Sequence, residues 1–111
     1  MAVLGIIDVH GFTTEQYDAV VDHMGVEGHA LGSIYLHLAA QTADGLRIVE
    51  IWDDKDEFEK FIDTTLFPAM AALNPDQTHT VTVLPLHNVF TPRLTELPGL
   101  SRHAQPGQSI A

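Results

Sequence analysis

The chain has no cysteine and few basic residues. Among its 111 residues, 5 Lys and Arg stand against 15 Asp and Glu, which gives a formal net charge of −10. The lack of cysteine excludes disulfides, thiolate nucleophiles, iron–sulfur clusters and sulfur-rich zinc sites. The acidic balance would repel a nucleic-acid backbone or an anionic membrane surface at neutral pH. We therefore expect neither nucleic acid nor a membrane as a partner.

Long hydrophobic runs and nucleotide-binding loops are also missing. No run approaches the roughly 18 apolar residues of a membrane span, and Met1–Val9 lacks the charged start of a secretion signal. A cytoplasmic protein is the expectation. No phosphate-binding glycine loop, nucleophile elbow or dinucleotide fingerprint occurs, so nucleotide cofactors are disfavoured and no cofactor is expected.

What the sequence does contain is the composition of one folded domain. Hydrophobic residues make up 45% of the chain and charged residues 18%, which is typical of a globular protein. Periodicity and capping signals predict βαββαβ, the order of a ferredoxin-like α+β fold with a four-stranded antiparallel sheet and both helices on one face. The predicted elements are a strand at Ala2–Val9, a helix from the capping pair Thr13 and Gln16 to Met24, strands at Gly32–Gln41 and Leu46–Trp52, a helix from the cap Asp54 to Leu73, and a strand at Thr80–Phe90.

Three segments depart from this regular pattern. Glu27–Leu31 is bounded by glycines and is expected to be a loop. Pro68 should kink the second helix or begin a second short one, and Pro85 places the last strand at an edge or a bulge. Residues 91–111 lose periodicity and gain Pro, Gly and Ser, so the domain is expected to span residues 1–90. The remaining tail could lie along the domain or a partner subunit through Leu94, Leu97 and Leu100.

The hairpin between the two central strands predicts which side chains share a face. A two-residue turn at Asp44-Gly45 would set Ala43 opposite Leu46, His37 opposite Trp52 and Ala39 opposite Glu50. Alternation then gives one face with polar and aromatic residues and one aliphatic face. The first face holds Tyr35, His37, Glu50 and Trp52, and the second holds Ile34, Leu36, Leu38, Val49 and Ile51. Because helices cover only one face of such a sheet, a second copy of the chain is expected to cover the other, as in a homodimer.

The element order and two segments resemble a known group. GLRIVEIWDDKDEFEKF (Gly45–Phe61) and FPAM (Phe67–Met70) are similar to sequences of the dimeric α+β barrel superfamily, over about Ala2–Phe90. That superfamily includes antibiotic-biosynthesis monooxygenases, small polyketide cyclases and stress-responsive barrel proteins. The resemblance implies a homodimer with a pocket between sheet and helices in each subunit. It also implies an aromatic or polyketide-like ligand of secondary metabolism, and oxygenation, cyclisation or isomerisation without a cofactor.

Candidate chemistry centres on His37. Glu50 on the same face would orient its imidazole as an acid or base, although a core histidine satisfied by a carboxylate is an equal alternative. The predicted site has His37 and Glu50 as catalytic residues. Its predicted substrate-binding residues are Tyr17, Tyr35, Trp52, Phe58, Phe61 and His87.

Two other functions stay open at this stage. The chain could be a non-catalytic dimeric module that binds a small molecule or responds to stress, with His37 and Trp52 as packing residues. A cavity of roughly 300 Å³ or more beside Trp52 would favour a ligand site over such a module. His10, His37, His87 and Glu50 could also ligate a metal, but no close pair such as HxH occurs, so a metal is not expected.

Overall fold

The structured elements follow the predicted order. A computed structural model describes residues 1–24 and 32–102, and the loop predicted at Glu27–Leu31 lies outside the described residues. The elements are β1 (Val3–His10), α1 (Thr14–Met24), β2 (Ile34–Gln41), β3 (Gly45–Trp52), α2 (Lys55–Phe61), the π-helical turn η2 (Ile62–Leu66), α3 (Phe67–Leu73), β4 (Thr78–Pro85) and the 3₁₀ helix η3 (Leu94–Leu100).

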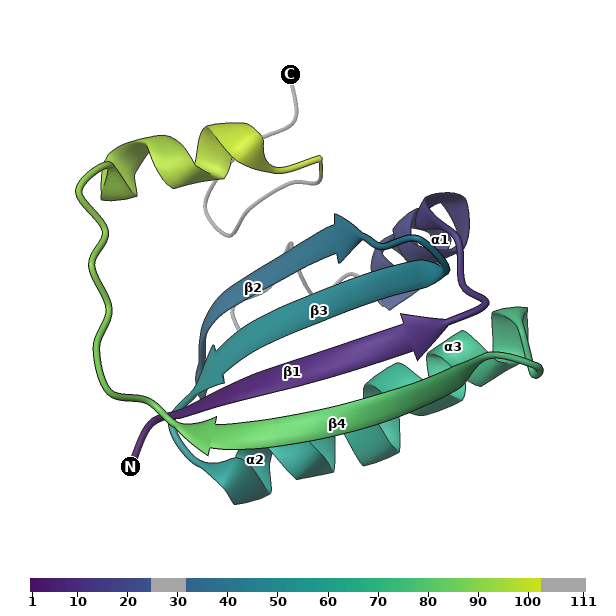
Figure 1. The fold of residues 1–111 in the computed structure, drawn as a ribbon, viewed down its shortest axis with the longest axis horizontal. Helices are drawn as coiled ribbons and strands as arrows, with labels where there is room; N and C mark the ends of the chain where they lie inside the picture. Colours follow the sequence, from purple (N-terminus) through teal and green to yellow (C-terminus); the bar gives the residue numbers. More distant parts are fainter. Residues whose placement is uncertain (25–31, 103–111) are drawn as a thin grey trace.

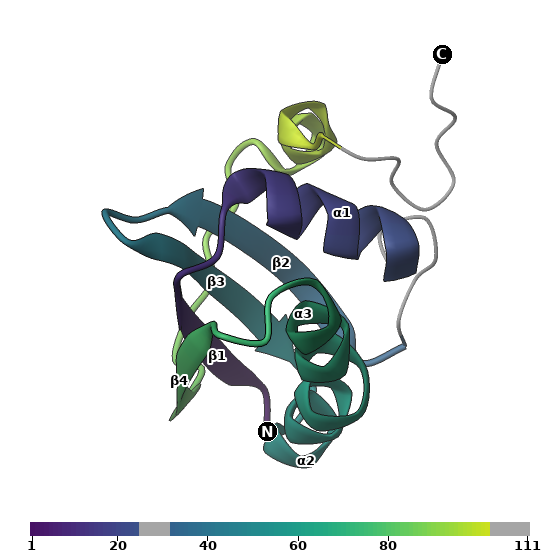
Figure 2. The ribbon, with the colours of Figure 1, turned by 90° about the vertical axis from the view of Figure 1, so that its right-hand side faces the viewer.

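The four strands form one antiparallel sheet in the order β2-β3-β1-β4 (Figure 1). All of α1, α2 and α3 lie on the same side of it, and the other side is not covered by a helix (Figure 2). This confirms the predicted ferredoxin-like fold. In the part of the chain that the structure describes, no helix has the length and apolar character needed to cross a membrane.

Both predicted helix caps are present. The Thr13 hydroxyl accepts from the Gln16 amide at 3.0 Å, while the Gln16 side chain accepts from the Thr13 amide at 3.0 Å, which makes a capping box. The Asp54 carboxylate accepts from the Glu57 amide at 2.8 Å at the start of α2. These caps explain why both helices begin where the sequence predicts, since each satisfies backbone N–H groups that lack an intrahelical partner.

Pro68 acts through a π-helical turn. The proline occupies the first turn of α3, and it has no N–H to donate to the carbonyl of Thr64 four residues earlier. The chain responds by widening at η2, where the Phe67 amide donates to the Ile62 carbonyl five residues back. The predicted interruption is therefore a single wide turn between α2 and α3.

The hairpin register differs from the prediction by two residues. Gln41 pairs with Leu46, and the Thr42 amide donates to the Gly45 carbonyl at 2.9 Å, which leaves Ala43 and Asp44 as the turn. Gly45 belongs to β3, where a Cβ would lie 1.9 Å from the Val9 carbonyl oxygen. The glycine is thus required by the close approach of β1 and not by the turn.

The corrected register brings the two candidate residues opposite each other. His37 pairs directly with Glu50 and not with Trp52, and Ala39 pairs with Ile48 and not with Glu50. A shift of two residues leaves every side chain on its predicted face, because side chains alternate with a period of two. An irregularity between Ile34 and Leu36 then breaks the alternation at the start of β2.

The core lies between the sheet and the helices. It contains Val3, Ile7, Val9, Phe12, Val20, Leu46, Ile48, Trp52, Phe58, Ile62, Leu66 and Met70. The ring of Phe58 fills the space above Gly5, where an added Cβ would lie 2.5 Å from the ring. Ile34, predicted on the aliphatic face, instead packs against this core, because the irregularity in β2 turns it toward the helices.

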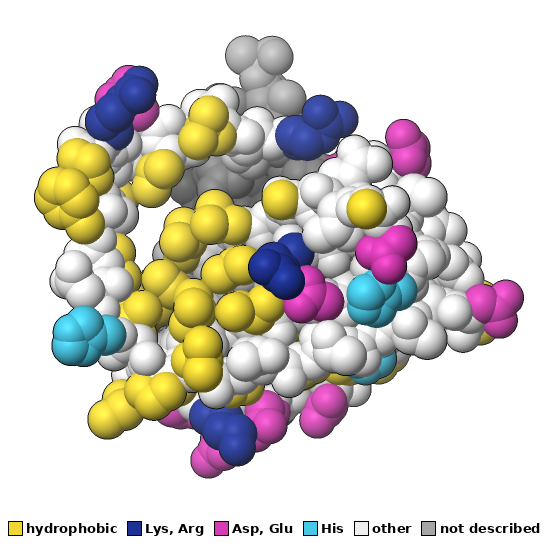
Figure 3. Space-filling view, in the orientation of Figure 1, with side chains coloured by type: hydrophobic (Ala, Val, Ile, Leu, Met, Phe, Trp, Pro, Cys, Tyr) yellow, Lys and Arg dark blue, Asp and Glu magenta, His cyan; other side chains and the backbone are white. Residues whose placement is uncertain are grey.

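The uncovered face of the sheet is apolar. Alternation and strand register place Leu4, Ile6, Leu36, Leu38, Val49, Ile51 and Leu84 on it. We call these residues the open face. They form the central hydrophobic patch of Figure 3. The strand register places the Asp8–Arg47 ion pair on the same face. A sheet that faces water on one side normally carries polar residues there.

The chain after β4 leaves the sheet. The Leu86 amide donates to the Ala2 carbonyl at 3.0 Å, after which residues 87–91 have no regular structure and a turn at residues 92–93 leads into η3. β4 ends at Pro85 and not at Phe90 as predicted, so Pro85 closes an edge strand. We call residues 86–102 the arm.

Candidate acid/base site

Four side chains form a continuous hydrogen-bonded row on the helix side of the sheet. The Glu50 carboxylate accepts from the Trp52 indole N–H at 2.8 Å through Oε1 and pairs with His37 Nδ1 at 2.6 Å through Oε2. His37 Nε2 is hydrogen bonded to the Tyr17 hydroxyl. We call these residues the Tyr17–His37–Glu50–Trp52 row.

The fold positions each member of the row. Glu50 and Trp52 alternate along β3, while His37 lies opposite Glu50 on β2. Tyr17 reaches down from the buried stripe of α1, and its ring stacks on the His37 imidazole at an angle of 12°. Side chains of α1 and β3 therefore converge on the imidazole that β2 carries.

Burial makes the carboxylate a strong acceptor. Glu50 is 1% exposed, and a buried carboxylate needs a donor for each oxygen. Trp52 can only donate, so Glu50 accepts at Oε1. The ionised carboxylate holds the proton of His37 on Nδ1, which leaves Nε2 to accept from the phenol when the ring is neutral and to donate when it is charged. The row can thus shift a proton between Tyr17 and His37.

A recess lies beside Trp52. It has a volume of about 240 Å³ and is lined by Gly32, Ser33, Trp52, Glu57, Lys60, Phe61, Thr64 and Thr65. The Trp52 indole is thus shared, because it lines the recess and also donates to Glu50. His37 and Tyr17 do not line the recess, and its volume is just below the range of about 300–1,000 Å³ usual for ligand pockets.

The predicted substrate-binding residues separate in the structure. Tyr17, Trp52 and Phe61 lie in the row or the recess. Phe58 is a fully buried core residue and not a pocket wall. Tyr35 and His87 lie in neither the row nor the recess.

Tyr35 is displaced by the irregularity in β2. It is 68% exposed, and a hydrogen bond to Asp53 together with the charge of that carboxylate raises the pKa of its phenol. His87 is exposed beyond the end of β4, because the strand stops at Pro85.

The histidines proposed as metal ligands do not converge. His10 lies at the end of β1 and pairs with Asp44, whereas His37 lies on the helix side of the sheet. Within residues 1–24 and 32–102, no group of three His, Asp or Glu side chains is arranged to hold a metal ion.

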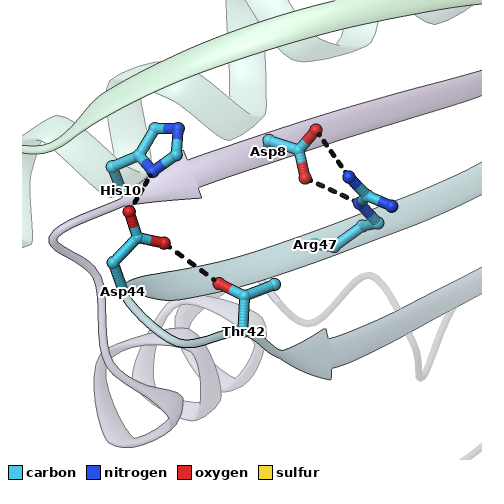
Figure 4. Close-up of polar contacts among 5 residues, drawn as sticks. All are labelled: Asp8, His10, Thr42, Asp44 and Arg47. Atoms are coloured by element: carbon cyan, nitrogen blue, oxygen red, sulfur yellow. Dashed lines mark hydrogen bonds and ion pairs between the residues drawn. The ribbon is translucent and has the colours of Figure 1, made fainter.

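A second polar cluster lies at the hairpin end of the sheet (Figure 4). His10 Nδ1 lies 2.9 Å from Asp44 Oδ2, and Arg47 pairs with Asp8 at 2.7 Å and 3.3 Å. The first contact joins the end of β1 to the β2–β3 turn. Neither pair was predicted from the sequence.

This contact predicts an acid-sensitive contribution to stability. The hydrogen bond from His10 lowers the pKa of Asp44 from its ordinary value of 3.8, so the folded protein gains stability from the ionised form. That gain is present above 3.8 and is lost as the pH falls through the lowered pKa. We expect the Tm difference between the protein and Asp44→Asn to shrink progressively as the pH falls below about 5.

The measurement is thermal denaturation at half-unit pH intervals from 5 to 2.5. Thr42→Val removes the 3.4 Å hydroxyl contact to the same carboxylate, the smallest of the contributions that lower this pKa, and should keep most of the pH dependence of the unsubstituted protein. A Tm difference for Asp44→Asn that does not change with pH would contradict the proposed linkage.

Comparison with known proteins supports the fold. No family model matches the chain, and no curated protein matches it significantly. SnoaB, a cofactor-independent oxygenase from Streptomyces nogalater, has a similar structure, with a TM-score of 0.59 at 12% identity over 79% of this chain and 95% of that chain. A protein from Deinococcus radiodurans described as an antibiotic biosynthesis monooxygenase has a TM-score of 0.56 at 15% identity over 81% and 96%.

A dimeric ferredoxin-like protein of unknown function from Thermobifida fusca is also similar, with a TM-score of 0.50 at 16% identity over 76% of this chain and 92% of that one. The chain therefore has the ferredoxin-like fold seen in antibiotic biosynthesis monooxygenase structures and in dimeric proteins. This confirms the resemblance noted in the sequence at the level of fold. Because one fold hosts many functions, the activity has to be argued from the site.

Proposed function

We propose that the chain is a small enzyme that moves a proton on an aromatic or polyketide-like ligand, using the Tyr17–His37–Glu50–Trp52 row. The observation that carries this proposal is the buried Glu50, whose two oxygens both accept hydrogen bonds, one of them from His37. A buried charge is costly, and here it holds an imidazole in one tautomer with its other nitrogen on a phenol. A nonpolar side chain would fill the same space at lower cost.

The chemistry follows from this arrangement. Removal of a proton from an acidic C–H group next to a carbonyl leaves a carbanion, and His37 accepts the proton directly or through the Tyr17 oxygen. Isomerisation and cyclisation need only this proton transfer. Oxygenation needs molecular oxygen as a second substrate, as the resemblance to oxygenases in fold suggests. The aromatic side chains of Trp52 and Phe61, with ring centroids 5.3 Å apart, favour a flat ligand in the recess. Because His37 and Tyr17 do not line the recess, the mechanism requires the reacting part of the ligand to extend past Trp52 to these two side chains.

The test uses an anthrone, a tricyclic aromatic ketone with an acidic methylene group. We expect the protein to accelerate its conversion, followed by absorbance and by oxygen uptake. His37→Ala should reduce the rate by about 10²–10⁴-fold, the usual contribution of one acid or base. His79→Ala serves as the control, because His79 stacks on Phe67 at 3.8 Å and lies outside the row. Equal rates for His37→Ala and the unsubstituted protein would refute the mechanism.

A non-catalytic binding module is the second candidate, and the small volume of the recess favours it. In that case an aromatic ligand would bind beside Trp52 and quench its fluorescence without being converted. His37→Ala would then leave the affinity unchanged, whereas Phe61→Ala would weaken it.

We also propose that the protein works as a homodimer in which two open faces pack together. The apolar residues of the open face support this, since a sheet face exposed to water normally carries polar residues. Native mass spectrometry at micromolar concentration tests it directly.

A further inference from the structure

The arm is short of contacts with its own subunit. Among the described residues, every hydrogen bond and ion pair of positions 87–100 lies within the arm, for example between Arg93 and Glu96 at 2.6 Å. Leu97 and Pro98 of the arm are partly buried, and Arg102 meets Asp18 of α1 at 3.4 Å. In Figures 1 and 2 the arm passes around the end of the sheet, and η3 lies beyond the β2 edge, clear of the open face.

The same segment carries large apolar side chains that face water. Phe90 is 82% exposed and Leu100 is 81% exposed, and Val89 and Leu94 are also exposed. Figure 3 shows a gap between the arm and the hydrophobic patch of the sheet. Large apolar side chains that gather on an exposed segment indicate a surface that another molecule covers.

The size of the open face indicates what that surface is. Four strands about 4.8 Å apart and eight residues long, at about 3.3 Å each, give a footprint of about 500 Å². A standard stable interface buries about 800 Å² on each partner. An arm from each subunit would add apolar surface to a contact between two such sheets.

Charge favours the same arrangement. The arm carries two of the 5 basic residues of the chain, Arg93 and Arg102, and only one of the 15 acidic residues, Glu96. The rest of the chain is strongly acidic. An arm that is slightly positive is attracted to an acidic surface, whereas two acidic domains without arms repel each other.

We propose that the arm of each subunit wraps the second copy of the chain, with Val89, Phe90, Leu94 and Leu100 packed on the partner subunit. This inference rests on the proposed homodimer, since an arm of this kind needs a partner. It goes beyond packing of the sheets, because it assigns part of the interface to residues outside the ferredoxin-like domain. The interface would then hold together through exchanged arms as well as through the open faces.

The test uses Phe90→p-benzoyl-phenylalanine, a photoreactive side chain of similar shape. We expect irradiation of the full chain to give a covalent product of dimer mass. Leu73→p-benzoyl-phenylalanine is the matched control, because Leu73 is an exposed apolar residue on α3 away from both the arm and the open face, and it should give monomer mass only. In a second measurement, Phe90→Ser should raise the dimer dissociation constant at least about tenfold, whereas Leu73→Ser should not.

The outcomes separate the two proposals. A protein that is dimeric by native mass spectrometry but whose position 90 marks only its own chain would overturn the arm inference and leave the sheet dimer intact. An unchanged dissociation constant in Phe90→Ser would overturn it as well. A monomer at every concentration would overturn both.

Discussion

Phe58→Ala is expected to lower the free energy of unfolding by about 3–5 kcal/mol, the cost of removing a large buried aromatic ring. Phe58 is 0% exposed and packs against Trp52 and Gly5. The loss would be a large part of the roughly 5–15 kcal/mol that stabilises a typical domain. Urea denaturation followed by circular dichroism measures it.

Gly5 provides a sharper test of the same contact. Gly5→Ala alone should destabilise by about 1–3 kcal/mol, because its Cβ would overlap the Phe58 ring. In the Phe58→Ala background the ring is gone, and the same change should cost much less. Gly32→Ala is the control, since nothing lies within 4 Å of a Cβ there. Additive costs for Gly5→Ala and Phe58→Ala would show that the two residues do not share this space.

Glu50→Gln is expected to leave the chain folded and to reduce anthrone conversion by about 10²–10⁴-fold. Trp52 can only donate, so the amide must present its oxygen to the indole and its NH₂ group to His37 Nδ1. That nitrogen then becomes an acceptor, and the ring proton moves to Nε2. The imidazole would donate to Tyr17 and could no longer accept its proton.

Nitrogen-15 NMR of the histidine rings tests this reversal directly, because the two tautomers have different ring shifts. Asp56→Asn, an exposed carboxylate in the first turn of α2, is the control for loss of one negative charge and should change neither the tautomer nor the rate. A His37 ring that keeps its proton on Nδ1 in Glu50→Gln, or a rate that does not fall, would contradict the role given to the carboxylate.

Local signals predicted the fold well because each of them has a local cause. The capping pairs, the alternation along β3 and the effect of Pro68 all depend on residues a few positions apart. The same alternation placed His37, Glu50 and Trp52 on one face. Glu50 was therefore identified as the partner of His37 before their contact was known.

The errors arose where a contact is made across the fold. Gly45 was interpreted as a turn residue, but it is a glycine because β1 passes close to it, and β1 is 35 residues away from it in sequence, at His10. The irregularity beside Tyr35 has no signal in composition, since the residues around it suit a regular strand. The hydrogen bond between Tyr17 and His37 depends on how α1 packs on β2. The position of Tyr17 on the buried stripe of its helix was the one sequence signal that indicated this contact.

The wide turn at η2 links the core to the recess. Phe58, Ile62, Leu66 and Met70 follow one another at intervals of four residues, and all are buried. In a regular α-helix each such interval overshoots a turn by about 40°, so that three of them would rotate the row by about 120°. The wide turn reduces this rotation, because a π-helical turn contains more residues than an α-helical one, and Met70 therefore stays over the sheet. Thr64 and Thr65 of the same turn line the recess. A substitution that converts the wide turn into a regular α-helical turn would rotate Met70 away from the sheet. The same substitution would move Thr64 and Thr65, so the shape of the recess and the packing of α3 on the sheet are coupled.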